Sequence, residues 1–155
     1  MSESRPQGAD GIAMAVHGGA FAIAPSDREI CREGCRRALE RGLGVLRAGG
    51  AALDAVEAAV NVLEDEGLFD AGRGSFLDED GNVSMDAGIM DGTTLNTGSI
   101  AAAMGIPNAI TLARAVLESP HAVIVGDGAR RFAERHGVPV CDPAEMIHPR
   151  ERARW

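Results

Sequence analysis

The stretch that decides the fold is residues 63–92, LEDEGLFDAGRGSFLDEDGNVSMDAGIMDG, where a helical pattern gives way to an extended one. Upstream, apolar residues recur at helical spacing and predict an amphipathic helix. They are Leu53, Val56, Val60 and Leu63. Three acids at residues 64–66 then meet the negative end of the helix dipole, which is unfavourable. A bound cation, a nearby arginine such as Arg73, or full exposure to solvent would each offset this, and we expect exposure.

The glycines that follow indicate tight backbone geometry. Gly72 and Gly74 flank Arg73, so the backbone there can adopt positive φ and bring carbonyls or amides together. The pattern fits an ion-holding loop or an ordinary turn into a strand, and the residues alone favour the turn. Residues 78–82 resemble part of a calcium loop but lack its spacing and its final Glu, so we expect a hairpin turn with Gly81 or Asn82 at positive φ.

Two strands are predicted after this turn. Residues 83–90 alternate between apolar and polar or small side chains, a turn follows at Asp91, and residues 95–104 resume an extended pattern. Asp86 should point away from the face that carries Ile89. We expect Asp86 and Asp91 to hold main-chain amides; without a third ligand nearby they do not form a transition-metal site.

Composition limits the function classes. The chain has 155 residues, a net charge of −8 and a pI near 4.9, which argues against nucleic-acid binding. No apolar run approaches membrane-spanning length, and residues 1–11 lack a signal-peptide pattern, so we predict a disordered lead-in and a cytoplasmic protein. Cys31, Cys35 and Cys141 are expected to be buried, reduced thiols. Aromatic residues make up only 3% of the chain, so part of the core is expected to lie elsewhere.

The N-terminal part predicts a strand and a long helix. Residues 12–16 form an apolar run typical of a buried strand, and it ends at His17-Gly18-Gly19, where another backbone or a ligand could approach closely. We interpret His17 as structural rather than catalytic. Residues 26–29 read as a capping box, and the helix should continue to about Ala48. Its buried face should carry Ile30, Gly34, Ala38, Leu39, Leu43 and Leu46.

The C-terminal part alternates helices with one strand. Asn108 is a predicted N-cap for a helix over residues 109–118, and residues 122–125 should form a short buried strand. A further helix should run over residues 126–134 and end at His136-Gly137. A last short helix is expected after Asp142-Pro143.

Five segments together resemble the α subunit of plant-type L-asparaginases, also called isoaspartyl peptidases. The segments are residues 16–20 (VHGGA), 68–75 (LFDAGRGS), 85–92 (MDAGIMDG), 106–114 (IPNAITLAR), and Pro120-His121 with residues 126–129 (GDGA). They occur in the family's order and spacing from about residue 12 to 136. The resemblance implies an α+β fold, with residues 12–155 as the α-subunit half of a four-layer αββα sandwich of the N-terminal-nucleophile hydrolases.

The resemblance also implies a self-processing amidohydrolase acting on L-asparagine or β-aspartyl dipeptides. Its nucleophile would be an N-terminal Thr on a β subunit from the same precursor, with that residue's own amino group as the base. Gly92-Thr93 lies between the two predicted strands, so we reject it as the cleavage site. The chain would then carry no catalytic residue of its own, would be inactive alone, and would assemble as (αβ)2. The alternatives are a glycosylasparaginase-like amidase and a non-catalytic remnant with a binding or scaffold role.

Two kinds of site residue are implied within this chain. The family's structural sodium ion, held by main-chain carbonyls, maps to Leu63, Glu64, Glu66, Phe69, Ala71 and Arg73. Asp70 stands where the family usually has an Asn that helps to position the nucleophilic threonine, and Phe21 stands where it usually has a glycine. No cofactor for catalysis is implied.

Overall fold

The computed structural model describes residues 11–20 and 22–155, so residues 1–10 of the predicted lead-in, and Phe21, lie outside the described residues. The main elements in chain order are α1 (Arg28–Arg47), α2 (Ala52–Asp65), β1 (Met85–Met90), β2 (Thr97–Ala103), α3 (Ala109–Leu117), β3 (Val123–Val125), α4 (Asp127–His136) and α5 (Pro149–Arg154). Short 3-10 turns lie at η2 (Pro25–Asp27), η3 (Gly72–Gly74) and η4 (Pro143–Met146). This mixture of helices and strands agrees with the predicted α+β class.

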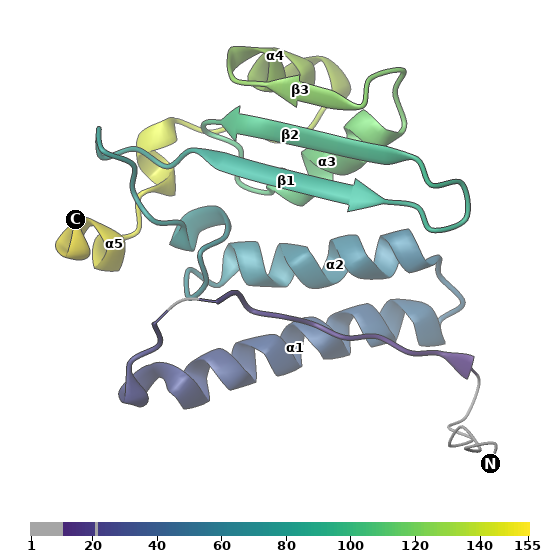
Figure 1. Ribbon diagram of the computed structural model, residues 1–155, viewed down its shortest axis with the longest axis horizontal. Helices are drawn as coiled ribbons and strands as arrows, with labels where there is room; N and C mark the ends of the chain where they lie inside the picture. The colour runs from purple at the N-terminus through teal and green to yellow at the C-terminus, as the bar shows by residue number, and fades with distance from the viewer. Residues whose placement is uncertain (1–10, 21) are drawn as a thin grey trace.

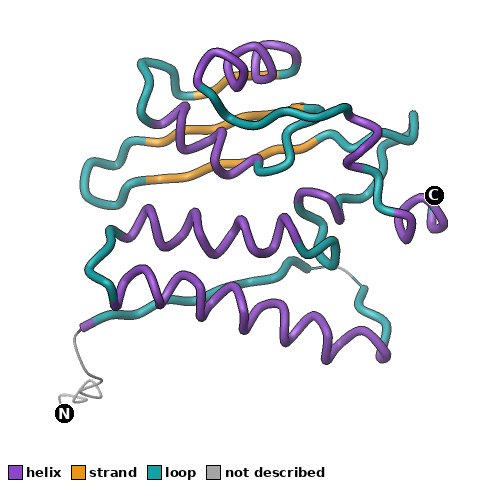
Figure 2. The backbone as a smooth tube through the Cα atoms, turned by 180° about the vertical axis from the view of Figure 1, so that it is seen from behind, coloured by secondary structure: helices purple, strands orange, loops and turns teal. Residues whose placement is uncertain are grey.

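The three strands form one sheet in the order β1-β2-β3. β1 and β2 are antiparallel, as the turn at Asp91 predicts, and their register shifts between Met85 and Ala87. β3 lies parallel to β2 because the chain crosses over through α3 between them. Helix α3 covers one face of the sheet, as Figures 1 and 2 show from opposite sides.

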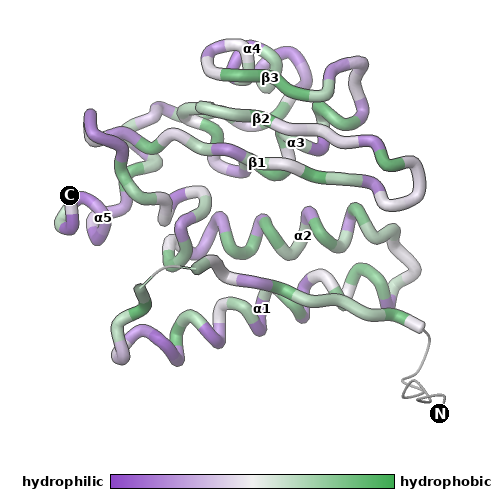
Figure 3. Tube along the Cα trace, in the orientation of Figure 1, coloured by the Kyte–Doolittle hydropathy of each residue, from purple (hydrophilic) through white to green (hydrophobic). Residues whose placement is uncertain are grey.

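The two faces of the sheet differ in burial. Ile89 and Ile100 are buried beneath α3, whereas Met90, Val123 and Val125 are more than half exposed. The strand predicted over residues 122–125 is therefore present, but its predicted burial is wrong, because Val123 and Val125 project from the uncovered face. Figure 3 shows that β3 is strongly hydrophobic along its trace. The uncovered face is thus partly apolar.

The N-terminal segment is not a strand, which contradicts our prediction. Residues 12–19 run along α1 without a regular ladder (Figure 1), and Met14 and Val16 pack onto the cluster that contains Phe69. A strand needs a neighbouring strand to pair its main chain, and the only sheet in the described residues contains β1, β2 and β3. The apolar run instead packs on helix side chains.

Helix α1 packs through small residues. Its buried positions are Cys31, Gly34, Ala38 and Gly42, so the helix can approach α2 and the following loop closely. Ile30, predicted to be buried, is 52% exposed. The predicted capping box is also wrong: residues 25–27 form a 3-10 turn, and no side chain caps the start of α1. Cys31 is buried as predicted, while Cys35 and Cys141 are only partly buried.

The C-terminal elements follow the prediction and add one helix. Gly137 ends α4 in the left-handed conformation, with φ of 71°. Asp142 caps η4 with a capping box to Glu145, and α5, which we did not predict separately, follows. None of the helices in the described part of the chain has the length and apolar content needed to cross a membrane.

Candidate functional site

A cleft of about 390 Å³ lies where the end of α2, the loop around η3, β1 and the start of α3 meet. Three carboxylates line it: Glu64, Asp70 and Asp86. Hydroxyl groups come from Ser75 and Ser84. The cleft therefore combines acidic and hydroxyl groups with glycine backbone. Most of its lining residues come from the stretch of residues 63–92 that decides the fold.

Asp70 and Asp86 each accept a hydrogen bond from a main-chain amide. Phe76 N donates to Asp70 Oδ1 at 2.9 Å, and Ala102 N donates to Asp86 Oδ1 at 2.8 Å. Ala102 has φ of 50°, an unusual value for a residue with a side chain. Asp86 thus holds the irregular end of β2, as predicted from its place in a strand.

Asp91 organises the turn between β1 and β2. Thr93 N donates to Asp91 Oδ1 at 2.9 Å, and Thr94 Oγ1 donates to Oδ2 at 2.7 Å. These hydrogen bonds, first that of the Thr93 amide, hold the pKa of Asp91 below its ordinary value. The prediction that Asp91 holds main-chain amides is confirmed, and Thr93 lies in a turn between two strands, as expected.

Glu64 is buried, with 3% of its surface exposed, which contradicts the expected solvent exposure. Ile110 N donates to Glu64 Oε1 at 3.0 Å, and Asn108 Nδ2 donates to Oε2 at 3.3 Å. Burial raises the pKa of Glu64 to about 7, against the lowering effect of these hydrogen bonds. The carboxylate therefore caps the N-terminus of α3 from another helix. Asn108 lies at the N-cap position as predicted, but its side chain donates to acids instead of accepting from α3.

Glu66 pairs with Arg37 and not with Arg73, the arginine that the sequence suggested. Arg37 Nε donates to Glu66 Oε1 at 2.6 Å, and the side chain of Glu66 is only 15% exposed. Its Oε2 is buried without a hydrogen-bond partner among the described residues. Arg73 instead donates to the main-chain oxygen of Glu145 at 3.2 Å. Of the three acids, Asp65 alone is exposed.

The glycines of η3 bring the loop backbone against the end of α2. Gly72 has φ of 55°, and a Cβ there would lie 2.4 Å from Glu64 O. A Cβ on Gly74 would lie 2.3 Å from Phe69 O. Glycine thus lets the loop backbone pack against two of the six residues whose carbonyls the family resemblance assigns to a sodium ion, Glu64 and Phe69. Among the described residues, no group of three or more His, Cys, Asp and Glu side chains gathers as a metal site.

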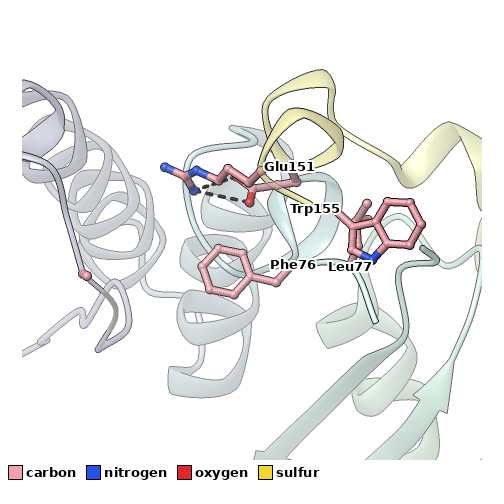
Figure 4. Close-up of a pocket in the computed structure, with 6 residues that line it drawn as sticks. Phe76, Leu77, Glu151 and Trp155 are labelled. Carbon is pink, nitrogen blue, oxygen red and sulfur yellow. Dashed lines mark hydrogen bonds and ion pairs between the residues drawn. The ribbon is translucent and has the colours of Figure 1, made fainter. Parts of the chain in front are cut away.

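A second hollow, of about 460 Å³, is lined by Phe76, Leu77, Glu151 and Trp155 among others (Figure 4). Glu151 is buried there between Arg150, with Nε at 2.5 Å, and Arg154, with Nη1 at 2.9 Å. Trp155 Nε1 donates to Asp78 O at 3.0 Å and so attaches α5 to the turn at residues 78–82. These contacts hold α5 together and fix it against the turn that follows the loop with Asp70 and Phe76.

Gly18 packs against Phe69 of the loop, and the neighbouring His17 is exposed. Gly19 N donates to His17 Nδ1 at 3.1 Å, within a local turn. A Cβ on Gly18 would lie 2.7 Å from the ring of Phe69 and 2.8 Å from Cys35 Sγ. We expected another backbone or a ligand to approach here, and what approaches instead is the side chain of Phe69. Burial raises the pKa of the Cys35 thiol, which makes this cysteine less reactive.

The family profile and the similar proteins both point to one family. The Asparaginase_2 family profile, described as asparaginase, matches residues 10–155. The chain belongs to this family. It is 44% identical over 143 residues to the isoaspartyl peptidase/L-asparaginase of Mus musculus, covering 91% of this chain and 44% of that protein. It is 48% identical over 134 residues to the plant-type L-asparaginase of Pyrococcus furiosus, covering 85% of this chain and 44% of that protein. The chain thus spans less than half the length of these relatives.

Proposed function

We propose that this asparaginase-family chain is the α half of an amidohydrolase that acts on L-asparagine or β-aspartyl dipeptides. The observation that carries the proposal is the cleft itself. Residues from three of the five resembling segments, 68–75, 85–92 and 106–114, line it together. Segments up to about forty residues apart in the sequence thus meet in one cleft. Relatives named isoaspartyl peptidase/L-asparaginase are similar to this chain over most of its length.

The proposed mechanism places the chemistry on a second half. An N-terminal Thr there would act as nucleophile, and its amino group, which titrates near pH 8 in water, would accept the hydroxyl proton. In this chain Asp70 would position that residue. The carboxylate can accept hydrogen bonds or pair with the ammonium but cannot donate while ionised.

A sodium ion fits the loop as a structural group. The six carbonyls of Leu63, Glu64, Glu66, Phe69, Ala71 and Arg73 would hold it, because hard oxygen ligands suit such a cation and the glycines let the loop fold tightly against the end of α2. When bound, the ion would fix the loop that carries Asp70. The uncovered sheet face would pack against the second half in a four-layer sandwich, within an (αβ)2 assembly.

The test is to express the complete gene that encodes this chain and to measure the intact masses of its products. We expect two fragments, the second starting with Thr, and release of ammonia from asparagine or of aspartate from β-aspartyl dipeptides. A single uncleaved polypeptide without either activity would overturn the proposal and favour the non-catalytic alternative. Activity only on a glycosylated asparagine would favour the glycosylasparaginase-like alternative.

The Asp70→Asn substitution tests the role of Asp70 in the assembled enzyme. A carboxylate beside the threonine ammonium raises the pKa of that amine, so the base is less available at neutral pH. We expect the acidic limb of the pH profile of kcat/KM to move down by about one unit in the variant. Glu79→Gln, on the exposed turn, is the matched control and should leave the profile unchanged. An unchanged profile in Asp70→Asn would show that Asp70 does not face the base.

A further inference from the structure

Two acids at the end of α2 reach in opposite directions. The carboxylate of Glu64 binds the start of α3, and that of Glu66 binds Arg37 on α1. Between these contacts the chain enters the loop of residues 67–76, which carries Asp70. The start of the loop is therefore held by side-chain hydrogen bonds to α3 on one side and to α1 on the other.

We infer that Glu64 and Glu66 are positioning residues that hold the loop of residues 67–76 between α3 and α1, and thereby fix Asp70 in the cleft. This inference rests on the proposed function, in which Asp70 positions the nucleophile. It adds the side chains that keep Asp70 in place.

The Glu64 contact couples the loop to α3. The amide of Ile110 lies in the first turn of α3, where no intrahelical acceptor exists, and Glu64 Oε1 satisfies it at 3.0 Å. Gly72 packs on the same residue: a Cβ on Gly72 would lie 2.4 Å from Glu64 O and 2.7 Å from Glu64 Cβ. A shift of Glu64 would therefore displace Gly72, two residues after Asp70.

The Glu66 contact couples the loop to α1. Arg37 Nε holds Oε1 at 2.6 Å, and a Cβ on Gly34 would lie 2.6 Å from Oε2. The same Gly34 position lies 2.8 Å from the ring of Phe69. Glu66 and Phe69 thus occupy one tight contact with α1, directly before Asp70. The hydrogen bond from Phe76 N to Asp70 Oδ1, at 2.9 Å, then closes the loop on itself.

The test uses the protein expressed from the complete gene, with Glu64→Gln, Glu64→Asp and Glu64→Ala. A glutamine keeps the length of the side chain and an accepting oxygen for Ile110 N. An aspartate keeps the charge but is one methylene shorter and cannot reach. Glu66→Ala removes the second contact, and Glu79→Gln on the exposed turn is the control.

We expect hydrogen exchange of the amides in residues 67–76 to accelerate about tenfold or more in Glu64→Asp, Glu64→Ala and Glu66→Ala, but not in Glu64→Gln or the control. For folded enzyme, kcat should fall roughly ten- to a hundredfold with KM nearly unchanged, and Glu64→Gln should restore it. Wild-type exchange in Glu64→Asp, or an unchanged kcat in folded Glu64→Ala, would overturn the inference. Hydrogen exchange is measured without substrate, so it tests this inference even if the wild-type protein has no activity. An inactive wild type would overturn the proposed function only.

Discussion

At the scale of single residues, Gly72 combines a positive φ with a close backbone contact in the candidate site. A side chain at this position would be strained by φ of 55° and would overlap Glu64 O at 2.4 Å. We expect Gly72→Ala to lower the free energy of unfolding by about 2–4 kcal/mol. Gly44 in α1 has no atom within 4 Å of its Cβ position, so Gly44→Ala should be neutral or stabilise by up to about 1 kcal/mol. Denaturant titration of both variants checks this, and equal effects would contradict the tight loop.

Glu64 should make stability depend on pH. Its folded pKa of about 7 lies above the ordinary value of 4.5 because of burial. The folded state therefore holds a proton that the unfolded state releases between these values, so stability falls as pH rises from about 4.5 to 7 and then levels off. The loss should be on the order of 3 kcal/mol. Comparing Glu64→Gln with wild type at pH 5 and pH 7.5 by denaturant titration isolates this contribution, and parallel pH dependence in the two proteins would contradict it.

The sequence predicts residue roles that arise from nearby residues. Asp91 accepts from the Thr93 amide and the Thr94 hydroxyl, two and three residues away in its own turn, and a turn signal is enough to predict such contacts. Glu64 instead binds Ile110, which is 46 residues further on, and Glu66 binds Arg37, which is 29 residues before it. Nothing in the local pattern shows which acids at a helix end will be covered by another helix. Exposure was therefore expected for all three acids of residues 64–66 and is correct only for Asp65.

At the scale of elements, the same division between local and distant causes holds. Helix α2, strand β1 and the end of α4 at Gly137 follow from apolar spacing, turn residues and a glycine stop signal. The predicted buried face of α1 is confirmed at Gly34 and Ala38 but is wrong at Ile30, because the contact with α2 uses small residues that permit close approach. The segment at residues 12–19 has the composition of a strand but no strand beside it in the described chain.

The packing of α3 on the sheet depends on a single glycine in β2. A Cβ on Gly98 would lie 2.2 Å from Leu117 N and 2.3 Å from Ala113 O, both main-chain atoms of α3. We expect Gly98→Ala to cost about 3 kcal/mol or more, because backbone cannot move aside as a side chain can. Gly88 is a matched control on the uncovered face of β1, where the nearest atom is Ser99 Oγ at 3.3 Å. Thermal unfolding should show a large loss for Gly98→Ala and a small one for Gly88→Ala; similar losses would mean that α3 can shift.

At the scale of the whole molecule, the described residues form three apolar clusters rather than one deep core. The largest lies between the sheet and helices α3 and α4, a second joins α1, α2 and Phe69, and a third lies between α2 and α3. None of them uses the outer side chains of β3. The low aromatic content predicted that part of the core would lie elsewhere, and the uncovered apolar side chains of the sheet indicate where it would continue.

The proposed assembly predicts that these side chains matter for association and not for the folding of this half. Val123 is 57% exposed and Val125 is 56% exposed, so changing both to Ser should alter the stability of this half by less than about 1 kcal/mol. If the face is covered by the second half, burying each valine contributes about 1.5 kcal/mol or more, and the double variant should weaken association roughly a hundredfold. Ile30→Ser, on α1 and 52% exposed, is the control and should leave association unchanged. Titration of the two co-expressed and separated halves by sedimentation measures this, and equal affinity of the double variant and wild type would place the interface elsewhere.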